Sequence, residues 1–190
     1  MRVVGGRHRG RRLIAPPGDA VRPTSDRARE ALFNILSHGD FAAAGSPFAD
    51  ENVLDAFAGT GALGIEALSR GAARAAFIET DRAALAALKR NLAALDEEDG
   101  VDIIAGDATR PPRAKYSCAL AFLDPPYRSA FAAPALEALS RMGWLAARAL
   151  AVIEISSSET FAVPNGFTMI DERKYGAAKL VFLRREGEQR

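Results

Sequence analysis

The chain has 190 residues, of which 48% are hydrophobic, and this composition fits one soluble domain large enough to bury a sizeable core. Its 25 Lys and Arg residues nearly balance its 24 Asp and Glu residues, which excludes a strongly charged, disordered tail protein. A chain of this length has no room for a separate substrate-binding domain beside an α/β core. A large ligand must therefore be bound by that core and a short arm.

Few residues are available for disulfides or metal ligation. The one cysteine, Cys118, excludes a disulfide framework, and the two histidines, His8 and His38, are too few for a zinc site, so we expect no metal. No stretch reaches the roughly 20 apolar residues of a membrane span, and no apolar segment follows the first charges. We expect a cytoplasmic protein that does not contact membranes.

The charge is unevenly distributed along the chain. Residues 1–29 carry a net charge of +6 and the remaining residues carry −5. All eight basic residues of the first segment are arginines, whose planar guanidinium groups bind phosphates through paired hydrogen bonds. This asymmetry predicts a polyanionic partner, and the alternative is a solvated leader that only aids solubility. The candidate contacts are Arg7, Arg9, Arg11, Arg12, Arg22, Arg27 and Arg29.

The first 38 residues predict a basic arm followed by a helix. Residues 2–14 contain a Gly-Gly turn between short apolar pairs, which indicates a short hairpin or an extended arm, and Pro16-Pro17-Gly18 ends it. A helix should begin near Thr24, Ser25 or Asp26, because apolar residues then recur at helical spacing as far as Leu36. We expect Arg22, Arg27 and Arg29 near the exposed start of this helix. A loop of small residues over 39–51 separates this unit from the rest.

Residues 52–190 predict a second unit, in which short apolar runs alternate with helical patterns. This alternation is typical of an α/β fold with a mostly parallel sheet. The expected strands are 53–57, 75–79, 101–105, 119–123 and 149–155, with a terminal antiparallel pair at 167–172 and 180–183. The expected helices are 61–70, 82–95 and 134–141.

A glycine-rich turn follows the first predicted strand. Residues 55–64 place Asp55, Phe57, Gly59, Thr60 and Gly61 at the carboxyl end of a strand, where parallel sheets bind their ligands. Glu79 ends the next strand 20 residues after Gly59, the separation at which a carboxylate reaches ribose hydroxyls. Asp107 follows the third strand and is either a contact to an adenine amino group or a turn residue.

The acid at the start of this turn favours one nucleoside cofactor over others. A carboxylate at Asp55 would repel the pyrophosphate of a dinucleotide, whereas it suits a cofactor that is positively charged and lacks phosphate. S-adenosylmethionine carries a sulfonium and an ammonium group. We therefore expect S-adenosylmethionine as the cofactor.

The sequence Asp124-Pro125-Pro126-Tyr127 follows the most apolar predicted strand. Two prolines remove two N–H donors, so this corner offers carbonyl oxygens and a carboxylate, and Tyr127 offers a flat ring for stacking. Acceptors beside a stacking surface complement the exocyclic amino group of a nucleobase. The predicted catalytic residues are Asp124, Pro125, Pro126 and Tyr127.

With these motifs the chain resembles class I S-adenosylmethionine-dependent methyltransferases, and in particular the RsmD family. The resemblance rests on the segments 2–6, 9–13, Pro16, 22–24, 29–36 and 174–176 in addition to the Asp-Pro-Pro-Tyr sequence. It implies a Rossmann-like sheet of seven strands, S-adenosylmethionine as donor, and guanine N2 of 16S ribosomal RNA as acceptor. The arginines of the arm would then bind RNA, with the small ribosomal subunit as the expected setting.

Three other functions remain open at the level of the residues. Asp-Pro-Pro-Tyr does not distinguish guanine N2 from adenine N6, so a DNA adenine-N6 methyltransferase is one alternative. A non-catalytic RNA-binding assembly factor with the same fold is another. The third is a protein glutamine methyltransferase, although such enzymes usually have Asn where this chain has Asp124.

Overall fold

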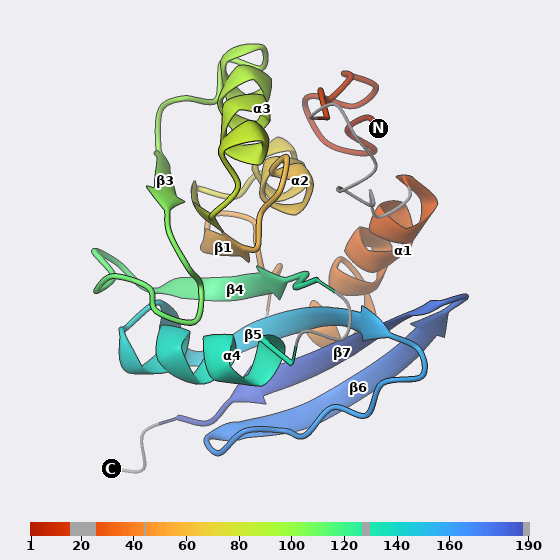
Figure 1. Ribbon diagram of the computed structural model, residues 1–190. Coiled ribbons are helices and arrows are strands. Elements are labelled where there is room, and N and C mark those ends of the chain that lie inside the picture. Colours follow the sequence, from red (N-terminus) through yellow and green to blue (C-terminus); the bar gives the residue numbers. More distant parts are fainter. Residues whose placement is uncertain (16–25, 44, 127–129, 188–190) are drawn as a thin grey trace.

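The computed structural model describes residues 1–15, 26–43, 45–126 and 130–187, and it has an α/β architecture (Figure 1). The helices are α1 (Asp26–Leu36), the 3-10 helix η1 (Gly39–Phe41), α2 (Ala62–Ser69), α3 (Arg82–Ala93) and α4 (Ala132–Arg141). The strands are β1 (Asn52–Ala56), β2 (Arg74–Glu79), β3 (Val101–Ala105), β4 (Cys118–Leu123), β5 (Leu145–Ser156), β6 (Phe167–Tyr175) and β7 (Ala178–Arg185).

The seven strands form one sheet in the order β3-β2-β1-β4-β5-β7-β6. The first five are parallel to one another, and β7 pairs antiparallel with both β5 and β6. This confirms the predicted Rossmann-like sheet with its terminal antiparallel pair. β1 lies in the middle of the parallel part. β2 and β3 extend the sheet on one side of β1, and β4 and β5 extend it on the other. Ligands of such sheets bind where the strand order reverses in this way.

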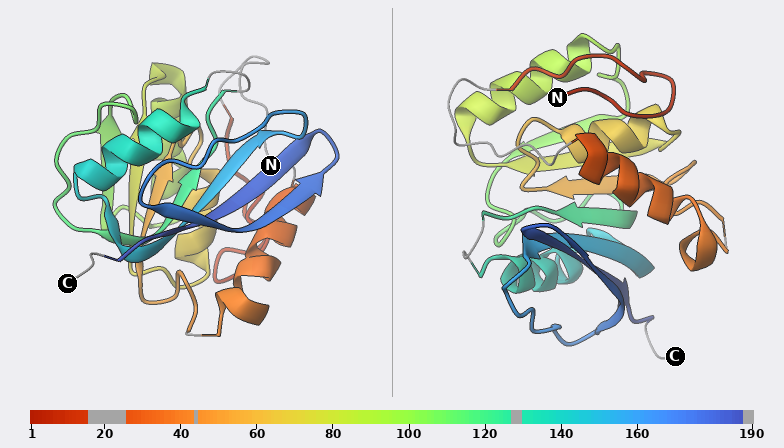
Figure 2. Two further views of the ribbon diagram at one scale, coloured as in Figure 1. Left: turned by 90° about the horizontal axis from the view of Figure 1, so that it is seen from below. Right: turned by 90° about the vertical axis from the view of Figure 1, so that its right-hand side faces the viewer.

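Helices cover both faces of the sheet, with α1, α2 and α3 on one side and α4 on the other (Figure 2). Alternate residues of the central strands point to opposite faces, so Phe122 packs with the first group of helices and Leu123 packs with α4. Phe33 of α1 lies 5.6 Å, between ring centroids, from Phe122 of β4. The N-terminal helix is therefore packed directly on the central strands.

The first residues form the expected hairpin-like arm. The Val3 amide donates to the Arg11 carbonyl at 2.9 Å, and the Gly10 amide donates to the Val3 carbonyl at 2.8 Å. Val3 and Leu13 are buried in the same apolar cluster as Phe33. The arm and α1 thus share the core of residues 52–190, although the sequence separates them with a loop.

Several strands are longer than the sequence pattern predicts, most clearly β5, β6 and β7, which covers Ala178–Arg185 instead of 180–183. β5 begins at Leu145 rather than 149, because pairing with β4 continues past a register irregularity between Cys118 and Leu120. β6 extends to Tyr175 rather than 172, and its added residues Arg173 and Lys174 are exposed. β6 is the edge strand of the sheet, where charged side chains are common and hydrophobic periodicity gives little signal.

Candidate active site

The predicted site residues lie at the carboxyl ends of neighbouring parallel strands. In spatial order, Asp107 follows β3, Glu79 ends β2, the glycine-rich turn follows β1, and Asp124 follows β4. Adjacent strands of a sheet are about 4.8 Å apart, so these groups form a row along one edge. The sequence placed them at strand ends, and the strand order brings them together.

The glycine-rich turn has a strained backbone that connects β1 to α2. Phe57, Gly59 and Gly61 all have positive φ angles, of 62°, 55° and 80°. A Cβ atom at Gly61 would lie 2.3 Å from the Leu88 side chain, so this position requires both the freedom and the small size of glycine. The Ala58 amide donates to the Ile78 carbonyl at 3.0 Å, which ties the turn to β2.

Asp55 is buried beneath this turn. Its Oδ2 accepts a hydrogen bond of 2.8 Å from the Gly64 amide in the first turn of α2, and only 2% of the residue is exposed. Burial raises the pKa of Asp55 to about 7, with a further contribution from the negative charge of Glu79 and an opposing one from the Gly64 bond. The visible role of Asp55 is therefore to fix the start of α2, and its contact with a cofactor stays a prediction.

Glu79 organises the backbone around it. Its Oε2 accepts from the Gly59 amide at 2.7 Å, and its Oε1 accepts from the amides of Thr80 and Asp81 at 2.7 and 2.8 Å. A carboxylate has about four lone-pair positions, and Oε2 has a single partner among the described residues. Glu79 thus keeps acceptor capacity for a ribose hydroxyl while it positions Gly59.

Asp107 forms a local turn. Its Oδ1 accepts from the Thr109 amide at 2.8 Å and from the Thr109 hydroxyl at 2.7 Å, and these bonds lower the pKa of Asp107. The turn interpretation of Asp107 therefore has a geometric basis. Its contact with adenine stays a prediction, and the exposed position of the residue is compatible with it.

The diproline corner leaves β4 directly beside the glycine-rich turn. The Asp124 amide lies 3.5 Å from the carbonyl oxygen of Ala56, the last residue of β1. Pro125 is buried and Pro126 is exposed. The diproline corner and the glycine-rich turn therefore lie side by side at the same edge of the sheet. Tyr127 lies outside the described residues.

The arginines of the arm fall into two groups. Arg9, Arg12 and Arg27 are exposed. Arg7 pairs with Glu97 at 2.5 Å, and the Arg11 guanidinium donates to the Ala94 carbonyl, so these two fasten the arm to the end of α3. Figure 2 shows the arm running beside α3. Arg22 lies outside the described residues.

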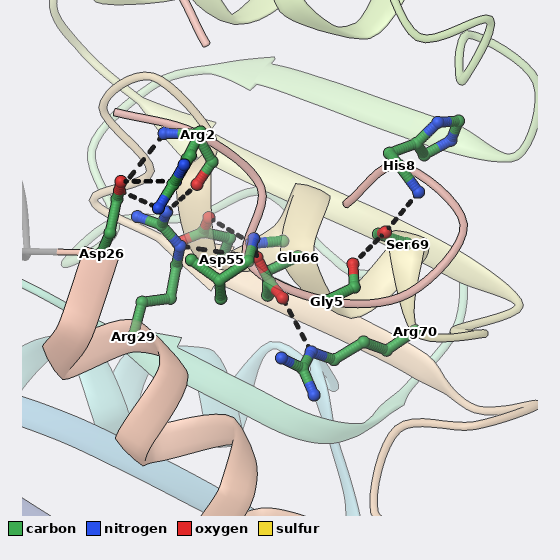
Figure 3. A network of polar contacts seen from close by, with 11 residues as sticks. Arg2, Gly5, His8, Asp26, Arg29, Asp55, Glu66, Ser69 and Arg70 are labelled. Carbon is green, nitrogen blue, oxygen red and sulfur yellow. Dashed lines mark hydrogen bonds and ion pairs between the residues drawn. The ribbon is translucent and has the colours of Figure 1, made fainter. Parts of the chain in front are cut away.

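The expectation that Arg29 lies exposed was wrong. Its side chain is fully buried, and its guanidinium contacts Asp26 at 3.0 Å, Glu66 at 3.5 Å and the Arg2 carbonyl oxygen (Figure 3). The first turn of α1 faces the sheet at this position, because residue 29 lies on the same helix face as Leu32, Phe33 and Leu36. Arg29 therefore joins the arm to α1 and α2 and does not present its charge to solvent.

Glu66 and Asn91 are two residues of this region that the sequence patterns did not single out. The buried Glu66 carboxylate accepts from the Val4 amide at 2.8 Å and from Arg70 at 2.7 Å (Figure 3). The Asn91 amide nitrogen donates to the carbonyls of Ile14 and Thr60, at 3.0 and 3.1 Å. Asn91 thus connects the arm to the glycine-rich turn. In the sequence, the only indication of these roles was that each is a polar residue on the apolar stripe of its helix, Glu66 in α2 and Asn91 in α3.

The two histidines make contacts within the fold, and the cysteine is buried in it. The His8 ring lies 2.6 Å from Glu97, and the His38 ring contacts the Asn34 carbonyl at the end of α1. Cys118 is buried, which raises the pKa of its thiol to about 12. The described part of the chain contains no cluster of potential metal ligands. None of the helices in those same residues has the length and apolar character of a membrane span.

The groups at this edge fit S-adenosylmethionine. Glu79 offers a carboxylate to ribose hydroxyls, and Gly59, whose amide it accepts from, has no side chain that would obstruct a cofactor there. The predicted contacts at the ends of β1, β2 and β3 include three carboxylates and neither Lys nor Arg, which suits a cationic ligand without phosphate.

Comparison with known proteins agrees with this fit. Residues 1–184 match the family described as Conserved hypothetical protein 95. The chain is 35% identical to Ribosomal RNA small subunit methyltransferase D of Escherichia coli, covering 99% of this chain and 91% of that protein, and 32% identical to the protein of the same name in Haemophilus influenzae, covering 93% and 89%. A solved structure named Putative methyltransferase yhhF from Escherichia coli has a TM-score of 0.81 and 36% identity, with 99% of each chain covered. The chain therefore belongs to this family, the RsmD family of class I S-adenosylmethionine-dependent methyltransferases.

Proposed function

We propose that the protein transfers a methyl group from S-adenosylmethionine to the exocyclic N2 amino group of a guanine in 16S ribosomal RNA. The observation that carries this proposal is the contact between the diproline corner and the end of β1, where the glycine-rich turn begins: the Asp124 amide lies 3.5 Å from the Ala56 carbonyl. It brings an acceptor-rich corner beside the glycine-rich turn that would bind the cofactor. Relatives 35% and 32% identical are named ribosomal RNA small subunit methyltransferases, which supports an rRNA substrate.

The cofactor would be held by the residues at the ends of β1 and β2. Glu79 would accept hydrogen bonds from ribose, while the backbone of Phe57, Gly59 and Gly61 would surround the methionine part, with Thr60 beside it and Asp55 fixing the start of α2. Asp107 would lie toward the adenine. When bound, S-adenosylmethionine supplies an electrophilic methyl group on a positively charged sulfur.

The diproline corner would prepare the guanine amino group as a nucleophile. The N2 lone pair is delocalised into the ring, which makes this nitrogen a weak nucleophile. If the Asp124 carboxylate and the Pro125 carbonyl accept its two hydrogens, the nitrogen moves toward tetrahedral geometry and its lone pair becomes available. Asp124 would take up the proton that is released after the transfer. Correct alignment of two reactants contributes roughly 7–11 kcal/mol to such reactions.

The target base must leave its stack to reach this corner. Unstacking costs a few kcal/mol and costs less in a single-stranded loop, which favours a loop of the rRNA as the acceptor. Tyr127 would return about 1–3 kcal/mol by stacking on the base. Pro126, which is exposed next to the buried Pro125, would border the base.

The arm would bind the RNA backbone. Arg9, Arg12 and Arg27 are exposed and would contact phosphates, together with Arg22. Arg7 keeps a side chain that is 54% exposed despite its pair with Glu97, so it would contribute to the same positive surface. Arg11 fastens the arm to α3, and Arg29 supports its base from within the core.

Methylation assays with mapped products test the proposal. The protein is incubated with labelled S-adenosylmethionine and, separately, with protein-free 16S rRNA, with small ribosomal subunits and with double-stranded DNA. Nucleosides are then analysed by mass spectrometry. We expect N2-methylguanosine at one position of the 16S rRNA. N6-methyladenine in the DNA, or no transfer to any acceptor, would overturn the proposal.

A further inference from the structure

A small pocket adjoins the diproline corner. It is lined by Pro125, Pro126, Phe131 and Glu159, together with residues at the start of α4 and the end of β5. Its inner space is about 10 Å³, which is room for one small polar group and not for a nucleobase ring. The pocket lies at the surface, since Pro126 and Phe131 are both exposed.

Glu159 reaches this pocket from the strand next to the catalytic corner. It lies three residues after the end of β5, and its amide donates to the Ser156 carbonyl at 2.9 Å, which turns the chain back at the edge of the sheet. β5 runs parallel to β4 and extends three residues past the last β4–β5 pair, Leu123 with Ile153. The chain after β5 then brings Glu159 to the pocket beside Pro125 and Pro126. Figure 1 shows the arrowheads of β4 and β5 pointing the same way.

Within the described residues, one oxygen of the Glu159 carboxylate lacks a donor. Its Oε2 is buried and has no hydrogen-bond partner among the described residues. A buried acceptor of this kind costs free energy unless a donor reaches it. The pocket walls near it include two prolines, which have no N–H group to offer. A water molecule or a ligand that enters the pocket can supply the donor that these walls do not.

The two candidate bases differ in what they present beside the amino group. In guanine, the N2 amino group is next to N1–H, which is a donor, so both groups on this edge need acceptors. In adenine, the N6 amino group is next to N1, which is itself an acceptor and would be repelled by a carboxylate. Enzymes that act on a base extruded from its stack identify it by hydrogen bonds to this same edge.

We infer that Glu159 is a specificity-determining residue that accepts a hydrogen bond from guanine N1–H while the diproline corner holds the N2 amino group. This inference rests on the proposed function and deepens it, because it selects guanine over adenine, which Asp-Pro-Pro-Tyr alone does not do. The base would rest on the exposed surface of Pro126 and Phe131, and only its N1 edge would enter the pocket.

The experiment compares two acceptors at the guanine that the methylation assay identifies. A synthetic fragment of the 16S rRNA carries either guanine or 2-aminopurine at that position. 2-Aminopurine keeps the exocyclic amino group, but its N1 is an acceptor. The wild-type protein should have a kcat/KM about 10- to 100-fold lower for the 2-aminopurine fragment, the size of discrimination that well-placed hydrogen bonds to a base give.

The Glu159→Gln variant should reduce this preference to within a few fold, because the Gln side chain amide can donate to the N1 acceptor or accept from N1–H. Glu137→Gln, the same change on the exposed side of α4, serves as the matched control and should keep the wild-type preference. Thermal unfolding verifies that both variants fold.

Two results would overturn the inference while leaving the proposed function intact. One is a wild-type protein that methylates both fragments equally, which decides the matter even if Glu159→Gln does not fold. The other is a folded Glu159→Gln variant that retains the wild-type preference, as expected if a water molecule alone satisfies Glu159. A wild-type protein that does not methylate guanine in 16S rRNA would instead overturn the proposed function itself.

Discussion

The row of strand ends has two parts that use their carboxylates differently. At the ends of β1, β2 and β3, the carboxylates of Asp55, Glu79 and Asp107 all accept hydrogen bonds from backbone amides of the protein. At the ends of β4 and β5, two prolines remove amide donors, and Glu159 keeps a buried oxygen that no described residue contacts with a donor. The first part is organised by the chain's own donors, whereas the second part has one buried carboxylate oxygen, Glu159 Oε2, that no donor of the described residues reaches.

This difference matches the two tasks of a methyl transfer. A cofactor that is bound in every turnover benefits from a turn that is already in shape, and the bonds of Glu79 and Asp55 provide that shape. An amino group that must be activated benefits from acceptors that its own hydrogens can satisfy in the transition state. The two parts should therefore respond differently to substitution.

The largest effect is expected at the acceptor-rich corner. Asp124→Ala removes the proposed acceptor for the amino hydrogens and should lower turnover about 100- to 10,000-fold, the usual contribution of a positioned acid or base. Because the turn after β1 is fastened by other residues, the Kd for S-adenosylmethionine should change by no more than a few fold. Single-turnover rates and calorimetry measure the two quantities. Full activity in this variant would refute the role given to Asp124.

The next effect concerns stability and comes from Asp55. Burial raises the pKa of this carboxyl to about 7 in the folded protein, whereas an unfolded Asp titrates near 3.9. Between these values the folded state binds a proton that the unfolded state has lost, so this group's contribution to stability decreases as pH rises from 4 to 7. The decrease is on the order of 4 kcal/mol.

Asp55→Asn isolates this contribution. Asn can accept the Gly64 bond without carrying a charge, so the free energy of unfolding of the variant relative to wild type should rise as pH increases from 4 to 7. Urea unfolding at intervals across this pH range measures the difference in unfolding free energy between variant and wild type. The contributions of other titrating groups are the same in both proteins and cancel in this difference. A difference that is independent of pH would show that Asp55 is ionised in the fold.

A smaller effect is expected at Glu79, on binding rather than on chemistry. Glu79→Ala removes the carboxylate that positions Gly59 and is proposed to bind ribose. Hydrogen bonds to charged groups contribute about 1.5–3 kcal/mol, so the Kd for S-adenosylmethionine should rise by about 10- to 100-fold. Turnover at saturating cofactor should remain close to wild type. An unchanged Kd, or a loss confined to turnover, would contradict the division between the two parts.

Most of the residues at this edge of the sheet were predictable from the sequence, because each belongs to a local sequence pattern. Glycines at a strand end, an acid 20 residues later and an Asp-Pro-Pro corner after an apolar strand are all local patterns. The parallel topology then places the patterns at one edge. The boundaries of β5 and β6 were less predictable, since β5 continues past a register irregularity and the exposed edge strand β6 has no apolar alternation.

Long-range polar contacts were not predictable. Arg29 was expected at the surface because it lies near the predicted start of the first helix, yet its partner Glu66 lies 37 positions further along the chain. Glu159 lies in a loop without a motif, and only its position beside Pro125 and Pro126 in one pocket gives it significance. Such residues are identified by three-dimensional proximity alone.

The smallest effect separates the arginines of the arm from one another. Replacing Arg9 and Arg12, which are exposed, with Gln should reduce the salt dependence of rRNA binding by about 0.7–0.9 in the log–log slope for each phosphate that the arm no longer binds. Arg29→Gln should leave that slope unchanged and destabilise the fold instead, because it breaks a buried ion pair with Glu66. Filter binding between about 50 and 200 mM salt, together with urea unfolding, distinguishes the two variants. Equal slopes for the Arg9/Arg12 double variant and wild type would mean that these two arginines do not bind the RNA backbone.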